Sequence, residues 1–302
     1  MRTDSKAGSV LHSKWTVIVI GKGHLGSLVA DSLTNCGHEV TFWRNDMAEL
    51  DARTISDISP IAVINTAGKT DLPWCESNQS ECWRCNVVEP VMLQRRLPTS
   101  VGLIHLSSGC VWTGPFNPSG LPFGPYDPPT PACFYSWTKV AADTMLMDEA
   151  SKSHRRLTIL RPRQVFSGVN SPRNTLSKML AYESLIDEPN SMTSADRIIS
   201  TIYRLLAHLT IPVSTISQNI MCVYNHGVTS PFLVGKMLAK AGLRPEPKIM
   251  EKSNLDTWHK PRRVDVVMRD DDFEKFVPAA RVENDLARAI EEYKKNKDVK
   301  PS

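Results

Sequence analysis

The sequence contains no long hydrophobic run. Its longest apolar stretches, such as residues 15–20, are far shorter than the ~18 residues that a membrane-spanning helix requires. Residues 1–14 are polar and lack the apolar segment of a signal peptide, so we predict a flexible leader there. These absences predict a cytoplasmic protein with no membrane partner.

A strong excess of one charge is also missing. Lys and Arg together number 36 and Asp and Glu number 32, which gives a net charge of +4 over 302 residues. Basic residues are spread along the chain, so the balance does not point to a nucleic-acid partner. A mild positive excess suits a phosphorylated or otherwise anionic small ligand.

The seven cysteines show no disulfide framework. Their number is odd and their spacing irregular, which indicates reduced thiols in a cytosolic protein. Cys82 and Cys85 form a CxxC pair with Cys75 nearby, which leaves a zinc site open as an alternative. No second CxxC or HxxxH pair accompanies them and the segment looks helical, so we expect no metal.

Apolar, β-branched runs alternate with helical patterns along the chain. Continuous apolar runs are typical of strands buried on both faces of a parallel sheet, and the alternation predicts a doubly wound α/β fold of the Rossmann type. We expect strands at residues 15–20, 39–43, 61–64, 101–106, 157–161 and 220–224. We expect helices after residue 25, at residues 77–96, from residue 134, and near 173–183, 194–209, 230–242 and 282–296.

The pattern loosens after residue 165, which divides the chain into predicted parts. Residues 15–165 are predicted to form a dinucleotide-binding domain, and 166–293 a smaller C-terminal substrate-binding lobe that interdigitates with it. Residues 294–302 are predicted to be a basic tail. Residues 114–131 are rich in Pro and Gly but have motif residues on both sides, so we expect an ordered loop there.

A glycine motif joins the first predicted strand to a helix, and another strand follows within about thirty residues. Glycines in this context allow a tight turn and close approach to a pyrophosphate at the helix N-terminus. Small residues also follow the third strand, at the sheet edge where such folds bind ligands. The predicted cofactor-binding residues are Gly21, Lys22, Gly23, His24, Leu25, Gly26, Asn65, Ala67 and Gly68.

The second strand ends in Arg44 rather than in an acidic residue. Asp or Glu at this place binds the ribose hydroxyls of NAD, whereas a guanidinium matches the 2′-phosphate of NADP. We therefore favour NADP(H) over NAD(H). The alternative is an exposed loop arginine.

Tyr135 and Lys139 are four residues apart, so on a helix they lie on one face. An ammonium within ~4–6 Å is expected to lower the tyrosine pKa from ~10, which suits a proton donor to a carbonyl that is being reduced. Ser108, at the end of the fourth strand, can hydrogen-bond the same carbonyl oxygen. The alternatives are an ordinary exposed helix and a serine that caps the next turn.

With these motifs in order, the chain resembles an extended short-chain dehydrogenase/reductase of the dTDP-4-dehydrorhamnose reductase type. Several stretches are similar to the UDP-4-keto-6-deoxyglucose 3,5-epimerase/4-reductases, which complete UDP-rhamnose synthesis. The resemblance covers roughly residues 15–293 and rests on residues 67–68, 74–77, 108–110, 134–136, 171–174 and 189–193.

The resemblance implies NADP-dependent reduction of a nucleotide-linked 4-keto-6-deoxy sugar, with Ser108, Tyr135 and Lys139 as the reductase triad. It also implies 3,5-epimerisation by Cys110 with a basic partner at Lys178. A ketone at C4 acidifies the protons on C3 and C5, so a thiolate can remove one. The alternatives are a small buried Cys110, a surface Lys178, a pure 4-ketoreductase, or a non-catalytic cofactor-bound regulatory subunit.

Further contacts are implied by the resemblance alone. A homodimer is the expected assembly. Four arginines match family positions, and some are expected to meet diphosphate oxygens: Arg161, Arg163, Arg173 and Arg262. The alternatives for each are a helix-surface role and an ion pair within the protein. Tyr135, Lys139 and Pro162 are expected to contact the cofactor. The implied substrate contacts are Trp74, Glu76, Ser108, Arg163, Arg173, Asn174, Asn190, Ser191, Thr193 and Arg262.

Overall fold

A six-stranded parallel sheet forms the centre of the computed structural model, which describes residues 14–210, 218–251, 253 and 264–296. The strand order is β2-β1-β3-β4-β5-β9. The strands are β1 (Thr16–Ile20), β2 (Glu39–Trp43), β3 (Ala62–Asn65), β4 (Gly102–Leu106), β5 (Leu157–Pro162) and β9 (Gln218–Val223). The predicted doubly wound sheet is confirmed. The direction of winding reverses between β1 and β3, where such folds bind ligands.

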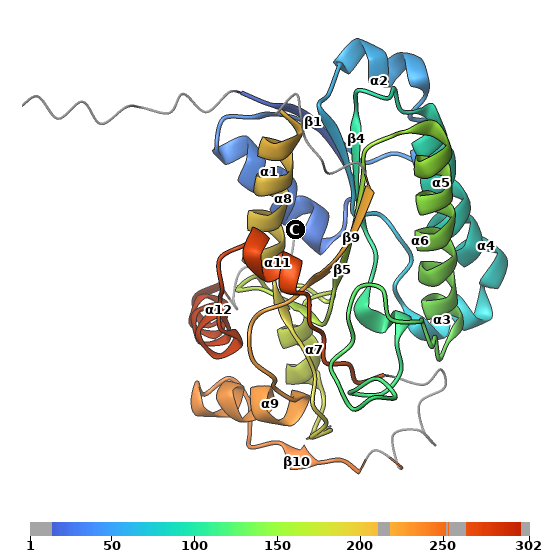
Figure 1. The fold of residues 1–302 in the computed structure, drawn as a ribbon. Helices are drawn as coiled ribbons and strands as arrows, with labels where there is room; N and C mark the ends of the chain where they lie inside the picture. The colour runs from blue at the N-terminus through green and yellow to red at the C-terminus, as the bar shows by residue number, and fades with distance from the viewer. Residues whose placement is uncertain (1–13, 211–217, 252, 254–263, 297–302) are drawn as a thin grey trace, which may run out of the picture.

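Helices cover both faces of the sheet (Figure 1). Val17 and Val19 of β1 belong to one apolar cluster, shared with α1 (His24–Asn35) and α8 (Ala195–Leu209), whereas Ile18 and Ile20 belong to the cluster on the opposite face. This second face lies under α5 (Glu89–Arg96) and α6 (Phe134–Ser153). Burial on both faces explains why the strands read as continuous apolar runs.

The helix predicted at residues 77–96 is present but is not continuous. It consists of α3 (Leu72–Ser77), α4 (Gln79–Trp83), a π-helical turn η2 (Arg84–Val88) and α5. A π turn inserts an extra residue into the helical repeat and is often found at functional sites. Short elements missed in the sequence are η1 (Met47–Glu49), α2 (Ala52–Ile58), η3 (Gly109–Val111) and α11 (Asp271–Phe276).

A third apolar cluster lies beyond the carboxyl ends of the strands, around Phe166, Leu176 and Leu286. It is built from α7 (Thr175–Ala181), α9 (Pro231–Lys240), α12 (Val282–Asn296) and the short strands β6 (Val165–Phe166) and β7 (Ser184–Leu185). The strand β8 (Thr193–Ser194) pairs with β6, and β10 (Lys248–Ile249) pairs with β7. The helix α12 continues to Asn296, so the predicted tail is wrong in its first three residues, 294–296.

The Pro-rich segment 114–131 is tied to the body of the protein, as expected for an ordered loop. The Trp112 indole donates to the Asp127 carbonyl at 3.1 Å, and Arg161 Nη1 donates to the Pro125 carbonyl at 2.8 Å. Arg161 also pairs with Asp143 at 2.9 Å, so this arginine holds the loop. Among the described residues, no helix is long and apolar enough to cross a bilayer.

Candidate active site

The glycine loop between β1 and α1 leaves no room for side chains at two positions. Gly21 has a φ of 108°, and a Cβ there would lie 2.7 Å from the Ala67 nitrogen. A Cβ on Gly26 would lie 1.9 Å from the Gly21 carbonyl oxygen. At Gly23, which precedes α1, no atom lies within 4 Å of such a Cβ, and no side chain caps the helix. The loop therefore fits the pyrophosphate of a dinucleotide.

The loop after β3 is pinned against this glycine loop. Asn65 accepts a hydrogen bond from the Ala67 nitrogen at 3.0 Å and contacts His105 Nδ1 at 3.1 Å. The Thr66 hydroxyl donates to the Ile20 carbonyl at 2.7 Å. These bonds bring residues 65–68 beside residues 21–26, as the sequence motifs predicted.

We expect Gly26→Ala to destabilise the fold by about 1–3 kcal/mol, because its Cβ would overlap the Gly21 carbonyl. Gly23→Ala is the matched control: open space surrounds that position, so its thermal stability should be unchanged while its affinity for NADPH falls. Thermal unfolding and NADPH fluorescence titration measure the two effects. Equal stability of the two variants would contradict the packing argument.

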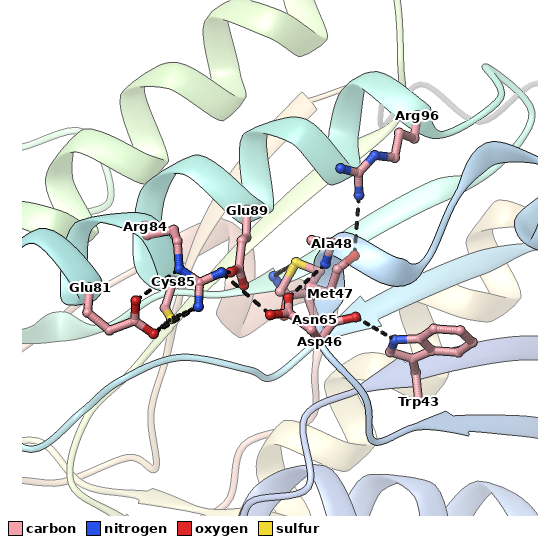
Figure 2. A network of polar contacts seen from close by, with 10 residues as sticks. All are labelled: Trp43, Asp46, Met47, Ala48, Asn65, Glu81, Arg84, Cys85, Glu89 and Arg96. Atoms are coloured by element: carbon pink, nitrogen blue, oxygen red, sulfur yellow. Dashed lines mark hydrogen bonds and ion pairs between the residues drawn. The ribbon is translucent and has the colours of Figure 1, made fainter.

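A polar network fixes the segment that follows β2 (Figure 2). The Asp46 carboxylate accepts from the Ala48 nitrogen at 2.9 Å and lies 3.5 Å from Arg84, while the Asp46 carbonyl accepts from the Trp43 indole at 3.0 Å. Arg96 donates to the Met47 carbonyl at 3.2 Å. The carboxylate closest in sequence to Arg44 is thus already paired. Arg44 is exposed, with its guanidinium 4.7 Å from the Phe42 ring centre.

The three residues predicted as a reductase triad meet at the carboxyl end of β4. Tyr135 and Lys139 lie in the first turns of α6, and both are buried. Lys139 donates to the Leu106 carbonyl at 3.0 Å, and the Ser108 hydroxyl is near enough to the Tyr135 phenol to lower its pKa. Ser108 also accepts from the Cys110 nitrogen at 3.1 Å, so its predicted capping role exists as well.

The expected lowering of the Tyr135 pKa is wrong. Burial of the phenol, followed by the nearby Cys110 thiol, raises the pKa of Tyr135 well above its ordinary value, although the Ser108 hydroxyl opposes this. Burial also lowers the pKa of Lys139. Sequence spacing put Lys139 on the same helix face as Tyr135 but contained no measure of desolvation, which is the largest cause of the shift. The phenol is therefore protonated at neutral pH, as a proton donor must be.

Asn86 is a site residue that the sequence analysis missed. It lies in the π turn η2 and is buried. Its amide nitrogen donates to Thr138 Oγ1 at 3.0 Å and to the Lys69 carbonyl at 2.9 Å, and its oxygen accepts from the Lys69 nitrogen at 2.8 Å. Asn86 thereby joins the loop after Gly68 to the helix that carries the tyrosine. The only signal in the sequence was a polar residue on the buried side of a helix.

Cys110 contacts a different cation from the one expected. Arg163 follows β5 and is buried, and its Nη1 lies 2.9 Å from the Cys110 sulfur. Arg163 was predicted to contact substrate. Lys178, the predicted basic partner, is an exposed residue of α7, and its role as a catalytic group stays a prediction.

Residues 190–193, predicted as substrate contacts, are buried and hold neighbouring chain segments together. Asn190 accepts from Arg163 Nε and Nη2 at 3.2 and 3.0 Å and from the Val266 nitrogen at 3.0 Å. Ser191 accepts from the Met268 nitrogen, and Thr193 accepts from the Arg163 nitrogen, both at 2.9 Å. Their contacts therefore indicate a supporting role around Arg163.

The other predicted substrate residues differ in their placement. Asn174 is fully buried and caps α7. Glu76 accepts from the Phe134 nitrogen at 2.7 Å, at the start of α6. Trp74 is partly buried in the cluster that includes Tyr135 and Cys110, and Arg173 is exposed and donates to Thr70 at 2.7 Å.

Two predicted contacts remain. Pro162 ends β5 and pairs with Val223 of β9, so its contact with the cofactor stays a prediction. Arg262 lies outside the described residues.

Comparison with known proteins identifies the class. The profile described as the RmlD substrate binding domain matches residues 15–255, so the chain belongs to this family. A bifunctional dTDP-4-dehydrorhamnose 3,5-epimerase/dTDP-4-dehydrorhamnose reductase of Arabidopsis thaliana is 29% identical over 234 residues, which are 74% of this chain and 72% of the relative.

A trifunctional UDP-glucose 4,6-dehydratase/UDP-4-keto-6-deoxy-D-glucose 3,5-epimerase/UDP-4-keto-L-rhamnose-reductase of the same plant is 31% identical over 196 residues. The match covers 60% of this chain and only 28% of that longer relative. Among solved structures, the UDP-rhamnose synthase of Acanthamoeba polyphaga mimivirus has a TM-score of 0.81 at 20% identity and covers 92% of this chain and 99% of its own. A dTDP-4-dehydrorhamnose reductase of Bacillus anthracis in complex with NADP has a TM-score of 0.74 at 18% identity, over 92% of this chain and 98% of its own.

Proposed function

We propose that the protein is an NADP-dependent 4-ketoreductase that also epimerises C3 and C5 of a nucleotide-linked 4-keto-6-deoxy sugar, with UDP- or dTDP-rhamnose as the product. The observation that carries this proposal is the placement of Ser108, Tyr135 and Lys139 at the end of β4, with Lys139 close to Gly68 in the loop that packs against the glycine loop. The activities in the names of the plant relatives support the same substrate class.

In the reduction, the chain itself supplies the proton and the means of holding the ketone. NADPH, when bound in the glycine loop, supplies the hydride to C4. Ser108 hydrogen-bonds the C4 oxygen, and the protonated Tyr135 phenol donates its proton to that oxygen as the C–O bond becomes an alcohol. The Lys139 ammonium stabilises the phenolate that remains, because the two groups share one buried helix face.

The reaction can be tested directly by following NADPH oxidation with UDP- and dTDP-4-keto-6-deoxyglucose. Turnover with either sugar is expected, and absence of turnover at high enzyme concentration would remove the substrate class. Deuterium uptake at C3 and C5 without NADPH separates the bifunctional enzyme from a pure 4-ketoreductase. Cys110→Ser should abolish this uptake and leave the fold intact.

A non-catalytic regulatory subunit is the competing function. It would require the cofactor site but not the proton donor. All three triad residues are present and buried or nearly so, which favours the enzyme.

For the cofactor we propose a preference for NADPH. Arg44 is exposed at the end of β2, and the neighbouring Asp46 carboxylate is engaged with Ala48 and Arg84. Arg44→Gln should weaken NADPH binding roughly 10- to 100-fold, because one hydrogen bond to a charged group is lost, and should leave NADH binding nearly unchanged. Arg53→Gln, on the exposed surface of α2, is the control. A tighter Kd for NADH than for NADPH in the wild type would reverse the proposal.

We also propose a homodimer in the cytoplasm. Free cysteines fit a reducing compartment. Large apolar side chains are exposed on the outer helices α4 to α6, among them Val88, Met92, Trp137 and Met145. Such a surface is typical of a subunit interface. Met92→Glu should convert a dimer into monomers in sedimentation experiments, and a monomeric wild type would contradict the proposal.

A further inference from the structure

Arg163 is a buried cation that the reduction does not use. Its side chain is 6% exposed and contacts Cys110, Asn190 and the Val264 carbonyl. Arg161, two residues earlier, pairs with the Asp143 carboxylate at 2.9 Å. By contrast, the partners of Arg163 among the described residues are all neutral groups. A buried positive charge of this kind stabilises an anion that forms next to it.

Cys110 is the group beside Arg163 that can become an anion. Its sulfur lies 2.9 Å from Arg163 Nη1, and the residue is partly exposed. Its position is fixed from both sides. A Cβ on Gly109 would lie 2.8 Å from the Met268 sulfur, and the Cys110 nitrogen is bonded to Ser108. The Cys110 thiol therefore contacts the Arg163 guanidinium and lies next to Ser108, which is proposed to bind the ketone oxygen.

Asn190 determines the direction of the guanidinium. Its amide oxygen accepts two bonds from Arg163, and its nitrogen donates to the Asp265 carboxylate at 2.8 Å. The Asn190 backbone nitrogen is itself bonded to the Thr229 carbonyl at 2.7 Å. Rigid support on one side of the guanidinium leaves Nη1 directed at the sulfur.

We propose that Arg163 is the positioning residue that holds Cys110 as the thiolate base of the epimerisation, with Asn190 orienting Arg163. This inference rests on the epimerase part of the proposed function. The thiolate takes the proton from C3 or C5, so that an S–H bond forms as the C–H bond breaks. The released electron pair forms the C=C bond of an enolate, whose charge rests on the C4 oxygen. A proton delivered to the opposite face restores the C–H bond, and the predicted acid on that face is Lys178.

The other ionisable groups near the sulfur do not supply the needed charge. Tyr135 and Cys133 add negative charge when ionised, which opposes a thiolate. Lys139 also interacts electrostatically with Cys110. However, its ammonium donates to the Leu106 carbonyl, and burial lowers the pKa of Lys139. Arg163 keeps its charge over the whole working pH range, because a guanidinium does not deprotonate in proteins.

Alkylation by iodoacetamide, followed by mass spectrometry of the Cys110 peptide, tests the proposal without any sugar. Thiolates are the reactive form, so Arg163→Met should slow alkylation of Cys110 roughly 10-fold at pH 7, and the two proteins should converge at high pH. Arg269→Met, which removes an exposed arginine from a neighbouring segment, should leave the rate unchanged. An unchanged rate in folded Arg163→Met, or a loss that is equal at every pH, would overturn the proposal.

The wild type provides a second test that does not depend on the stability of a variant. Between pH 6.5 and 8.5 the alkylation rate of N-acetylcysteine in the same sample should rise steeply, whereas that of Cys110 should change much less. An equally steep rise for Cys110 would refute the thiolate. Deuterium uptake at C3 and C5 reports separately on the epimerase. A fast-reacting Cys110 without any uptake would mean that the proposed function fails while the contact with Arg163 holds.

Discussion

Tyr135→Phe is expected to lower kcat for ketone reduction by roughly two to four orders of magnitude, the usual contribution of a positioned general acid. The substitution removes only the phenolic oxygen. The ring remains packed among Cys75, Cys82 and Cys133, so the fold should keep its stability. Single-turnover oxidation of NADPH measures the chemical step directly.

Two further measurements make this result specific to the proton donor. The affinity of Tyr135→Phe for NADPH should stay within a few-fold of the wild type, because the glycine loop is untouched. Deuterium uptake at C3 and C5 should also continue, since Cys110 and Arg163 keep their contact. Normal reduction by Tyr135→Phe would favour the regulatory subunit over the enzyme.

The fold could be predicted from the sequence because its signals are local and repeat along the chain. Each buried strand is a continuous apolar run, and Gly21, Gly23 and Gly26 mark the turn between the first strand and its helix. The short helices around Met47 and Phe273 were missed because they follow loops and contain too few turns to show a helical period. The π turn at residues 84–88 was also missed, since it depends on packing against α6.

The candidate site could be predicted only in part, because a motif identifies residues but does not show their partners. Tyr135 and Lys139 share one buried face of α6, as their spacing suggested, and Ser108 follows β4 near Tyr135, as its place at the strand end suggested. Asn190 and Thr193 instead support Arg163 from a distant part of the sequence. The pKa of Tyr135 was predicted in the wrong direction because burial depends on the whole fold. Contacts across more than twenty residues, such as Cys110 with Arg163, leave no mark on local spacing.

Reductase activity is expected to fall at high pH earlier than an ordinary lysine would allow. Burial lowers the pKa of Lys139, although Asp143 opposes this shift. The ammonium exists below that pKa and is lost above it, so kcat/KM should decline as pH rises, with a midpoint below the usual ~10.4 of lysine. Lys139→Met should reduce the same substrate at least ~100-fold more slowly, and its rate should not decline over this pH range.

The free energy of unfolding should rise with pH, whereas kcat/KM falls. This rise is expected only if Lys139 is charged at lower pH, and not if it is neutral throughout. Between its lowered pKa and the value in the unfolded chain, the folded protein binds fewer protons. The free energy of unfolding of the wild type should therefore rise with pH in that window, relative to Lys139→Met. Urea titrations at a series of pH values measure the difference. If Lys139 causes the loss of activity, its deprotonation must also change the free energy of unfolding. A wild-type minus Lys139→Met difference in that free energy that stays constant with pH would therefore assign the loss of activity to another group.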